Sequence, residues 1–391
     1  MTTREEATHR FYIAAGETSG DRHAADLLVE LLKIYPKAWF GGVGGRYLRG
    51  SGQDQLFDLS LHAVVGLTDV LPKIFTFLGF FKKIIADIEE KQPNVVILVD
   101  NPAFNLRLAK KIRQRFPDIK IVYYISPQVW AWKKGRAKAM SNLVHLLLLI
   151  FPFEKKWYDV NAPEVQAKWI GHPVMDRWKI DSTEIADEDE TYTISLMPGS
   201  RRKEIKAHLP MMLETAEKLN SYQSGLEFII LAADDRARSQ IEQIMGEGHA
   251  KGLPIEIQQG YQLTRLRRCK LAFVASGTAT LECCLAHVPM FVVYKVHPVT
   301  YIFGRILVKL PYLSIVNILA REKVVPEFLQ DKANAEHLFE ATRKFIKQPA
   351  WSEKMKEKLQ TVSSSLGKPG VNKRAAQAIR EMVDDFTNDK E

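Results

Sequence analysis

An aspartate stands directly after an apolar run of the kind that forms a buried strand. Asp100 follows residues 95–99 and precedes Asn101 and Pro102. At the carboxyl end of a parallel strand, a carboxylate faces the edge where ligands bind, and it can serve as a general base if an acceptor hydroxyl lies within hydrogen-bond reach. The structural alternative is that Asp100 caps a helix that begins near Pro102. Spacing alone leaves both interpretations open.

Another carboxylate follows the first apolar run of the chain. Residues 11–15 lead into the turn Gly16-Glu17-Thr18-Ser19-Gly20-Asp21. Ser19 or Asp21 suits the cap of the next helix, and Glu17 is predicted to point toward the ligand-binding edge. There Glu17 would either bind sugar hydroxyls or order the loop.

The strongest signal for a phosphate site is a turn of small residues in the second half of the chain. Ser276, Gly277 and Thr278 follow an apolar run and precede a helical run that contains Glu282. Such a turn lets backbone N–H groups approach an anion, and the N-terminus of the helix adds partial positive charge. Glu282, about one turn along, is placed to accept hydrogen bonds from ribose hydroxyls. The alternative is a plain helix cap by Ser276 or Thr278, with Glu282 exposed.

A second turn of this type contains an arginine. Gly199, Ser200 and Arg201 follow the apolar run 192–197, so both turns are predicted at the same carboxyl edge. The guanidinium fork matches the oxygens of a diphosphate and keeps its charge, which suits stabilisation of a departing diphosphate. The neighbouring Arg202 and Lys203 are interpreted as a solvated helix face.

Several common catalytic motifs are absent from the sequence. No G-x-G-x-x-G motif follows a strand, and neither a Walker A motif nor a G-x-S-x-G elbow occurs. No H-E-x-x-H motif or carboxylate cluster provides a metal site. The cysteines, Cys269, Cys283 and Cys284, lack zinc-ligand spacing and are predicted to be core thiols. We therefore expect neither a metal nor a cofactor.

These turns need strands and helices to position them, and the chain alternates the two. Strands as uniformly apolar as these are covered on both faces, as in parallel sheets. The predicted strands are residues 11–15, 95–99, 121–126, 146–151, 168–171, 192–197, 226–232, 255–258, 271–275 and 291–296. The fold class is therefore α/β, with two doubly wound, Rossmann-like lobes that face each other across a cleft.

The length and one acidic stretch suggest where the domains begin and end. A chain of 391 residues is too long for one ordinary core and suits two domains. We place a first α/β lobe at 1–185, a polar linker at 186–191 and a second α/β lobe at 192–350. Residues 351–391 are predicted to be C-terminal helices that pack back on the first lobe or on a partner subunit.

The formal net charge of +9 favours an anionic partner. Coulomb attraction does not distinguish nucleic acid, an anionic membrane face and a phosphorylated substrate. Aromatic residues interleaved with basic ones are confined to Trp130, Trp132 and Lys133, so no nucleic-acid partner is expected. Residues 1–10 lack a charged-then-apolar signal segment, which predicts a cytoplasmic location.

One segment is unusually rich in apolar and aromatic residues and is flanked by Lys73, Lys82 and Lys83. This combination suits partial insertion into an anionic lipid surface. The alternative is an ordinary buried helix, but four phenylalanines within residues 75–81 exceed what one core face hides. The predicted membrane-facing patch consists of Val64, Val65, Leu67, Leu71, Phe75, Phe77, Leu78, Phe80 and Phe81.

Together these motifs resemble those of the lipid-A-disaccharide synthase family. Besides the turns already described, residues 126–132 (Ser-Pro-Gln-Val-Trp-Ala-Trp), 171–173 (Gly-His-Pro), 317–320 and 326–330 follow the family's order and spacing. The resemblance therefore covers nearly the whole chain. The sequence departs from the family at Thr18, where many relatives carry alanine, and at Val316, where proline often precedes the asparagine.

The resemblance implies a GT-B fold and a specific glycosyl transfer. The donor would be UDP-2,3-diacylglucosamine, and the sugar would pass to the 6-hydroxyl of 2,3-diacylglucosamine 1-phosphate with inversion and release of UDP. This is a step of lipid A biosynthesis. The family also implies a peripheral position on the inner leaflet of the cytoplasmic membrane, and it leaves a homodimer open.

The resemblance also implies roles for particular residues. Asp100 matches the family's essential aspartate and would be the base. Arg201 and the turn at 276–278 would hold the diphosphate. Glu282 and Asn317 would contact the nucleotide. Glu17 matches an important glutamate whose role the sequence does not specify.

Two other functions fit parts of this sequence. A UDP-sugar 2-epimerase on the same two-lobed scaffold would isomerise the sugar and would need no apolar patch at 64–81. A non-catalytic nucleotide-sugar sensor would bind without chemistry, and replacement of Asp100 would leave its binding intact. The enzyme hypotheses differ in whether UDP release requires an acceptor.

Overall fold

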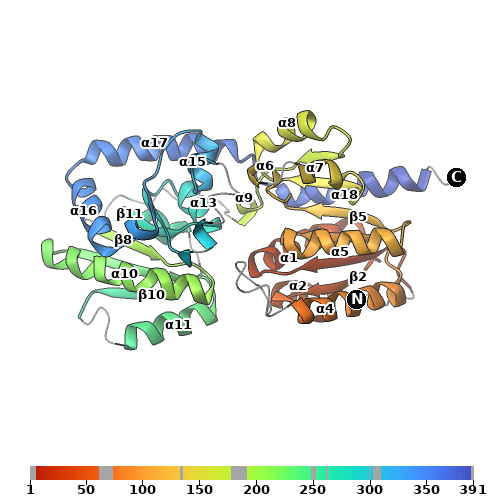
Figure 1. The fold of residues 1–391 in the computed structure, drawn as a ribbon, viewed down its shortest axis with the longest axis horizontal. Coiled ribbons are helices and arrows are strands. Elements are labelled where there is room, and N and C mark those ends of the chain that lie inside the picture. The colour runs from red at the N-terminus through yellow and green to blue at the C-terminus, as the bar shows by residue number, and fades with distance from the viewer. Residues whose placement is uncertain are drawn as a thin grey trace. The chain divides into compact units, whose positions relative to one another are not determined.

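The computed structural model describes residues 6–60, 74–132, 135–177, 192–247, 252–260, 263–298, 300–302 and 310–388. The chain forms two compact units, Met1–Arg177 with Leu366–Glu391, and Trp178–Ser365 (Figure 1). Each unit is built on one sheet of parallel strands flanked by helices, which confirms the predicted α/β class. The linker predicted at 186–191 lies outside the described residues.

The sheet of the first unit has the order β3-β2-β1-β4-β5-β6-β7. The strands are β1 (Arg10–Ala15), β2 (Trp39–Gly44), β3 (Asp54–Asp58), β4 (Val95–Val99), β5 (Lys120–Tyr124), β6 (Leu146–Leu149) and β7 (Ala167–Trp169). Apart from Arg10 at its start, β1 is as fully buried as β4, because helices cover both faces of the sheet. The strand order reverses between these two strands, and Ala15 pairs with Val99, so their carboxyl ends are level.

The helices of the first unit connect these strands. They are α1 (Thr18–Ile34), α2 (Arg46–Gly50), α4 (Ile74–Lys91), α5 (Pro102–Arg115), α6 (Val129–Trp132), α7 (Gly135–Met140), α8 (Pro152–Asn161) and α9 (Val174–Arg177). In α1 the buried face includes Ala24, Leu27, Leu28 and Leu31, the helical spacing that the sequence predicts.

The sheet of the second unit has the order β10-β9-β8-β11-β12-β13. The strands are β8 (Tyr192–Met197), β9 (Leu226–Ala232), β10 (Ile255–Gln259), β11 (Leu271–Ala275), β12 (Met290–Tyr294) and β13 (Glu327–Leu329). The helices are α10 (Arg202–Tyr222), α11 (Asp235–Gly246), α12 (Leu263–Arg268), α13 (Thr278–Leu285), α15 (Ile315–Ala320), the 3-10 turn η3 (Gln330–Lys332), α16 (Ala335–Ile346) and α17 (Pro349–Ser365). Here the order reverses between β8 and β11, where Met197 pairs with Val274.

The C-terminal helices, predicted as one group at 351–391, divide between the two units. α17 packs on α13, α15 and α16 of the second unit. α18 (Val371–Asn388) packs on α1, α9 and β6 of the first unit (Figure 1). Ile379 and Met382 are buried there, and each buried side chain of this size stabilises the fold by about 1.5–3 kcal/mol.

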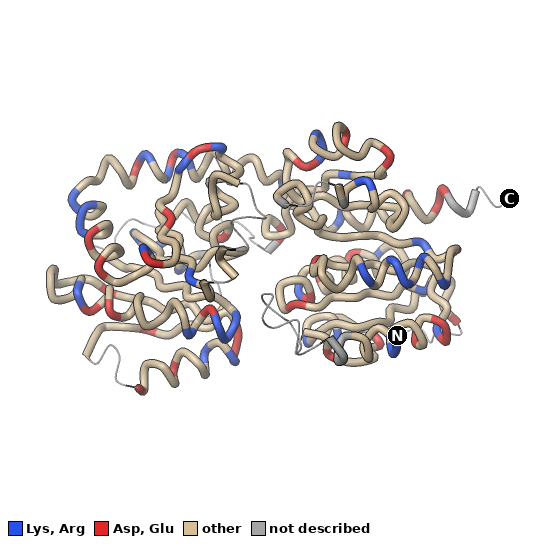
Figure 2. Tube along the Cα trace, viewed as in Figure 1, with Lys and Arg blue, Asp and Glu red and all other residues tan. Residues whose placement is uncertain are grey.

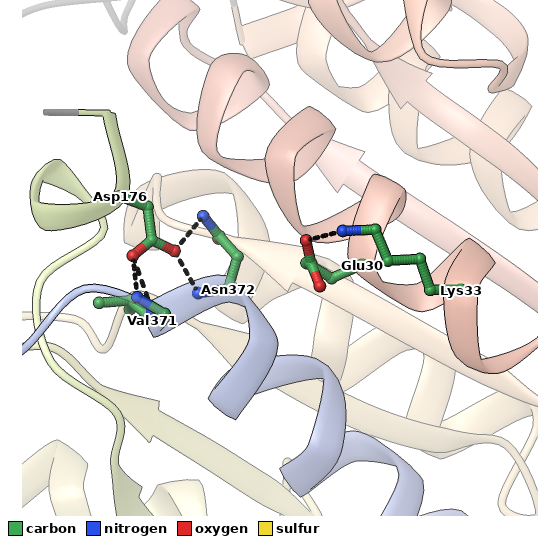
Figure 3. Close-up of polar contacts among 6 residues, drawn as sticks. Glu30, Lys33, Asp176, Val371 and Asn372 are labelled. Atoms are coloured by element: carbon green, nitrogen blue, oxygen red, sulfur yellow. Dashed lines mark hydrogen bonds and ion pairs between the residues drawn. The ribbon is translucent and has the colours of Figure 1, made fainter. Parts of the chain in front are cut away.

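A single carboxylate fixes the start of α18. Asp176 accepts hydrogen bonds from the backbone N–H groups of Gly370 (2.5 Å), Val371 (2.8 Å) and Asn372 (2.8 Å), and from Nδ2 of Asn372 (3.0 Å) (Figure 3). The hydroxyl of Tyr124 donates to Oδ1 of Asn372 at 2.7 Å. The last segment of the chain is therefore tied to the first unit by polar bonds as well as by packing.

The described residues of the predicted membrane patch differ in their burial. Phe81 is a core residue, 5% exposed and stacked on Phe104 with ring centroids 4.6 Å apart, so its assignment to a lipid-facing surface was wrong. Phe80 is half-buried and stacks on Phe57, whereas Leu78 is 52% exposed. The reason is that these two phenylalanines of α4 pack on other elements of the unit, Phe81 on α5 and Phe80 on β3. Outside the described residues lie Val64, Val65, Leu67 and Leu71 and the side chains of Phe75 and Phe77.

Among the described helices, none combines the length and apolarity that a membrane crossing requires.

Removal of the cap on α18 should destabilise the first unit. Asp176→Ala leaves three backbone N–H groups at the helix start without their acceptor, and we expect the free energy of unfolding to fall by about 1–3 kcal/mol. Lys33→Ala is the control, because Lys33 is 64% exposed and pairs only across a helix surface with Glu30 (Figure 3). Denaturant unfolding measures both; equal, small effects would show that Asp176 contributes nothing.

Candidate functional site

In the first unit, two predicted residues lie on neighbouring turns where the strand order reverses. Glu17 follows β1 as the N-cap residue of α1, and Asp100 follows β4. A Cβ atom on Gly20 would lie 3.8 Å from Cβ of Asp100, so the two turns pack closely. In open parallel sheets, ligands bind at the carboxyl ends of the strands at this reversal. The structure thus brings Glu17 and Asp100 to one edge.

The backbone at Asp100 is held in an uncommon conformation. Asp100 has a φ of +49° and Asn101 a φ of +41°, both in the left-handed region that side chains other than glycine rarely adopt. The carbonyl oxygen of Asp100 accepts hydrogen bonds from the Tyr123 hydroxyl (2.6 Å) and from Nδ2 of Asn105 (2.8 Å). Strain of this kind persists only where surrounding bonds enforce it, and it concentrates at functional sites.

The alternative role of Asp100 as a helix cap does not hold. The N-cap position of α5 is occupied by Asn101, with Pro102 at the first helical position. Asp100 lies one residue before the cap and is half-buried. The position therefore favours a carboxylate that faces the strand edge over one that terminates a helix.

Asp21 has a structural task different from the one predicted. It was considered as a cap of α1, but it accepts hydrogen bonds from the backbone N–H groups of Gly45 (2.7 Å), Tyr47 (2.9 Å) and Leu48 (3.3 Å), at the start of α2. Burial raises the pKa of Asp21, and these three bonds oppose that shift. A Cβ on Gly45 would lie 2.6 Å from Oδ2 of Asp21, so glycine is required for this approach. Asp21 joins the turns after β1 and β2.

In the second unit, the arginine turn is organised by Glu204, which the sequence analysis missed. Oε1 of Glu204 lies 2.8 Å from Nη1 of Arg201, and Oε2 accepts weaker bonds from the N–H groups of Ser200 (3.3 Å) and Arg201 (3.4 Å). Gly199 has a φ of +113°, and a Cβ there would lie 2.6 Å from Oε2 of Glu204. The signal was available, because a glutamate three residues after an N-cap is typical of a capping box. The Arg201 side chain remains 40% exposed and directed by this pair.

His208 was also missed, and it joins two carboxyl-end turns. Its Nδ1 donates to the carbonyl oxygen of Pro198 (2.9 Å), and its Nε2 accepts from the backbone N–H of Lys295 (3.0 Å). Since a carbonyl only accepts and an amide N–H only donates, these partners require the neutral tautomer with the proton on Nδ1. Burial lowers the pKa of His208, against the opposing effect of its hydrogen bond to Pro198. A buried neutral imidazole thus fixes the turn that presents Arg201.

The small-residue turn after β11 lies beside the arginine turn, because β8 and β11 are adjacent and parallel. Gly277, not Ser276 or Thr278, is the N-cap residue of α13, and its φ of +156° is a glycine conformation. Oγ1 of Thr280 donates to the Gly277 carbonyl at 2.7 Å and closes the first turn of the helix. Glu282 is only 4% exposed, so the alternative in which it is a solvent-exposed helix residue is wrong.

Asn317 does not have the predicted freedom to contact a nucleotide. Its Nδ2 donates to the Val325 carbonyl (2.9 Å) and to Oε1 of Glu327 (2.9 Å), and its Oδ1 accepts from the N–H groups of Val324 (2.8 Å) and Val325 (2.9 Å). Two donors and two acceptor positions are the full capacity of an amide side chain, and the residue is 0% exposed. This corrects the predicted nucleotide contact. Asn317 instead ties the loop before β13 to α15.

The cysteines are core residues, as predicted. Cys269, Cys283 and Cys284 are buried, and burial raises the pKa of each thiol. In the part of the chain that the structure describes, no group of three or more His, Cys, Asp or Glu side chains is arranged to hold a metal ion.

Solved structures share this architecture and define the class. Over 96% of this chain and 99% of that chain, the fold is similar to the kitacinnamycin glycotransferase, with a TM-score of 0.59 and 14% identity. With the same coverage it is similar to the UDP-GlcNAc 2-epimerase from Neisseria meningitidis bound to UDP-GlcNAc, with a TM-score of 0.52 and 12% identity. The protein therefore has the GT-B fold of two Rossmann-like lobes. At this identity the likeness shows the fold alone.

Sequence comparison narrows the class to one family. The family model for lipid-A-disaccharide synthetase matches residues 11–382. The chain is 36% identical over 387 residues to the lipid-A-disaccharide synthase of Geobacter sulfurreducens, covering 97% of this chain and 98% of that protein. The chain belongs to the lipid-A-disaccharide synthetase family and is a glycosyltransferase of lipid A biosynthesis.

Substitution of Asn317 should affect stability more than nucleotide binding. Asn317→Ala leaves buried N–H groups of Val324 and Val325 without acceptors, and we expect a loss of about 2–4 kcal/mol in the free energy of unfolding. UDP affinity of the folded variant, measured by calorimetry, should change by less than about threefold. A large loss of UDP affinity at unchanged stability would restore the predicted nucleotide contact.

His208 should make the second unit sensitive to acid. Because its folded-state pKa is lowered below the unfolded value of about 6.5, the unfolded chain binds more protons between the two values, and stability falls as the pH drops below about 6.5. His208→Gln retains one donor and one acceptor but does not titrate. Urea unfolding at about pH 7.5 and about pH 5 should show a smaller acid loss in the variant than in wild type. Equal losses would mean that other groups carry the effect.

Proposed function

We propose that this protein transfers 2,3-diacylglucosamine from UDP-2,3-diacylglucosamine to the 6-hydroxyl of 2,3-diacylglucosamine 1-phosphate, with inversion and release of UDP. Membership of the lipid-A-disaccharide synthetase family supports this reaction. The observation that carries the site assignment is Asp100, a carboxylate at the strand-order reversal of the first sheet, in a backbone conformation enforced by Tyr123 and Asn105.

In this proposal Asp100 is the general base. A single inversion needs one base to take the proton of the attacking hydroxyl, in contrast to a glycosidase, which needs two carboxylates. Because Tyr123 and Asn105 hold the backbone of Asp100, the position from which its carboxylate meets the acceptor is set before binding, which contributes to the rate. Glu17, on the adjoining turn, is proposed to assist Asp100 in the activation of the acceptor hydroxyl.

The donor diphosphate is assigned to the second unit. Arg201 supplies a permanent positive charge that opposes the charge developing on departing UDP, and Glu204 directs the guanidinium. The adjoining turn of Ser276, Gly277 and Thr278 begins α13, where backbone N–H groups favour an anion. Ser200 is proposed to contact the diphosphate, and Glu282 the nucleotide.

We further propose a peripheral association with the inner leaflet of the cytoplasmic membrane. The acyl chains of both substrates would come from that surface. Leu78 is an exposed leucine on α4, and Figure 2 shows basic residues along the adjacent helix α5. The exposed basic residues of α5 are Arg107, Lys110, Lys111 and Arg115. Basic side chains near an anionic surface contribute about 1 kcal/mol each.

Asp100→Ala should abolish most acceptor-dependent UDP release. Loss of a general base costs about 10²- to 10⁴-fold in rate, and we expect kcat to fall by this amount with little change in the KM for the donor. The measurement is UDP release by purified protein given UDP-2,3-diacylglucosamine, with and without the acceptor. Asp118→Asn is the control, because Asp118 is exposed and precedes β5 at the opposite end of the sheet.

Three results would contradict the proposal. UDP release that needs no acceptor would indicate an epimerase or a hydrolase. No release by wild type would favour a nucleotide-sugar sensor. An Asp100→Ala variant with unchanged kcat would remove Asp100 from the mechanism.

A further inference from the structure

The segment after β5 is held next to Asp100 but has no role in the mechanism described above. β4 and β5 are adjacent and parallel, with Val99 paired to Tyr124, and the backbone N–H of Asp100 donates to the Tyr124 carbonyl at 3.0 Å. Residues 126–131 follow, after Ile125 with a φ of +68°. The segment therefore begins at the same edge of the sheet as the proposed base.

One buried carboxylate anchors this segment. Oε1 of Glu154, on α8, accepts a hydrogen bond from Nε1 of Trp130 at 3.0 Å. Oε2 accepts from the backbone N–H groups of Phe151 (2.9 Å) and Ile150 (3.1 Å), which satisfies the start of α8. The bond to Trp130 is not needed to cap α8; it connects residues 126–131 to this helix.

The burial of the Glu154 carboxyl costs free energy of folding. This cost suggests that its hydrogen bond to Trp130 has a function beyond stability. Glu154 is 0% exposed, and its three donors are a ring N–H and two amides, all neutral. An ionisable group buried without an opposite charge destabilises a fold, and a neutral side chain could cap the helix at less cost. Burial raises the pKa of Glu154 to about 7 despite these hydrogen bonds.

Trp130 is the residue through which the segment is attached to α8. It is 7% exposed, and its ring meets Phe153 edge to face with centroids 4.8 Å apart. At the other end, Oγ of Ser126 lies 3.1 Å from the Tyr158 hydroxyl, and both residues are buried. The segment is thus fixed to α8 at two points, while Gln128 between them is exposed. A primary amide offers donors and an acceptor, the groups that recognise sugar hydroxyls.

We propose that Glu154 is a positioning residue for the acceptor: through Trp130 it holds residues 126–131 in the conformation that presents Gln128 to the acceptor sugar beside Asp100. This inference rests on the proposed function, in which the first unit binds the acceptor. Glu154 itself touches neither substrate. Glu154 acts by keeping the segment rigid. Binding to a segment that is already ordered costs less entropy than binding to one that must first become ordered.

The test compares variants that each change one side chain of this connection. Glu154→Gln replaces the carboxylate with a group that has one acceptor oxygen, and Trp130→Phe keeps an aromatic side chain but replaces the indole with a smaller ring that has no N–H donor. Gln128→Ala removes the exposed amide without changing a buried contact. Asp176→Asn is the matched control, a carboxylate of the same unit that also accepts backbone N–H bonds at a helix start.

The expected result is a selective loss of acceptor affinity. The KM for 2,3-diacylglucosamine 1-phosphate, and its Kd measured by calorimetry in detergent micelles, should rise about tenfold in each of the three variants, while the KM for the donor is unchanged. The double variant Glu154→Gln/Trp130→Phe should lose no more than the larger single effect, because both act through one bond. Asp176→Asn should lower the Tm and leave the acceptor Kd unchanged.

An unchanged acceptor Kd in Glu154→Gln and Gln128→Ala would overturn the inference, as would an equal rise in Asp176→Asn. Gln128→Ala keeps the test decisive if the buried variants fail to fold. Calorimetric binding also separates this inference from the proposed reaction. Wild type that binds the acceptor but releases no UDP would reject the reaction, and the variant affinities would still decide the role of Glu154.

Discussion

The reversal of strand order in each parallel sheet is the constraint on which the rest of the structure depends. Where the order reverses, the helices that follow two neighbouring strands leave on opposite faces, so their starting turns separate and leave an accessible edge. In the first unit this edge carries the turns after β1 and β4, and in the second the turns after β8 and β11. Each candidate residue of the transfer reaction, apart from Asn317 and Gln128, lies on or within about one helical turn of these turns.

Buried and half-buried carboxylates do much of the work of holding these turns. Asp21 joins the turns after β1 and β2, Glu204 directs Arg201, and Glu327 accepts bonds from Ser314 and Asn317. In each case an acidic side chain accepts N–H groups that a turn or a helix start leaves without partners. Several residues of the motifs therefore stabilise turns and do not themselves have to contact substrate.

This arrangement also explains a division between the two edges. In the first unit, Tyr123 and Asn105 hydrogen-bond the backbone carbonyl of Asp100 and so set the position of this residue. In the second unit, side chains of α10 hold the turn after β8, since His208 bonds the Pro198 carbonyl and Glu204 pairs with Arg201. Both arrangements set the geometry before any ligand binds, which is how a site stabilises charge without reorganising during the reaction.

The α/β class, most strands, the turns that follow them and the family were predictable from the sequence, because apolar runs, small-residue turns and ordered motifs are local features. The strands β2, β3 and β13 were not predicted, since β2 is rich in glycine, β3 is largely polar and β13 has three residues. Tertiary structure alone decided what the polar and aromatic side chains do. The side-chain amide of Asn317 is hydrogen-bonded to Val325 and Glu327, and Phe81 joins Phe104 in the core. The helix α18 packs on α1, and its start is capped by Asp176 of α9. The helix-start bonds of Glu204 and Glu154 lay within reach of a capping-box argument. The bonds of His208 to Lys295 and of Glu154 to Trp130 did not, because these partners lie far along the chain. Burial and hydrogen-bond partnership are properties of contacts between distant residues, and a linear pattern contains no direct information about them.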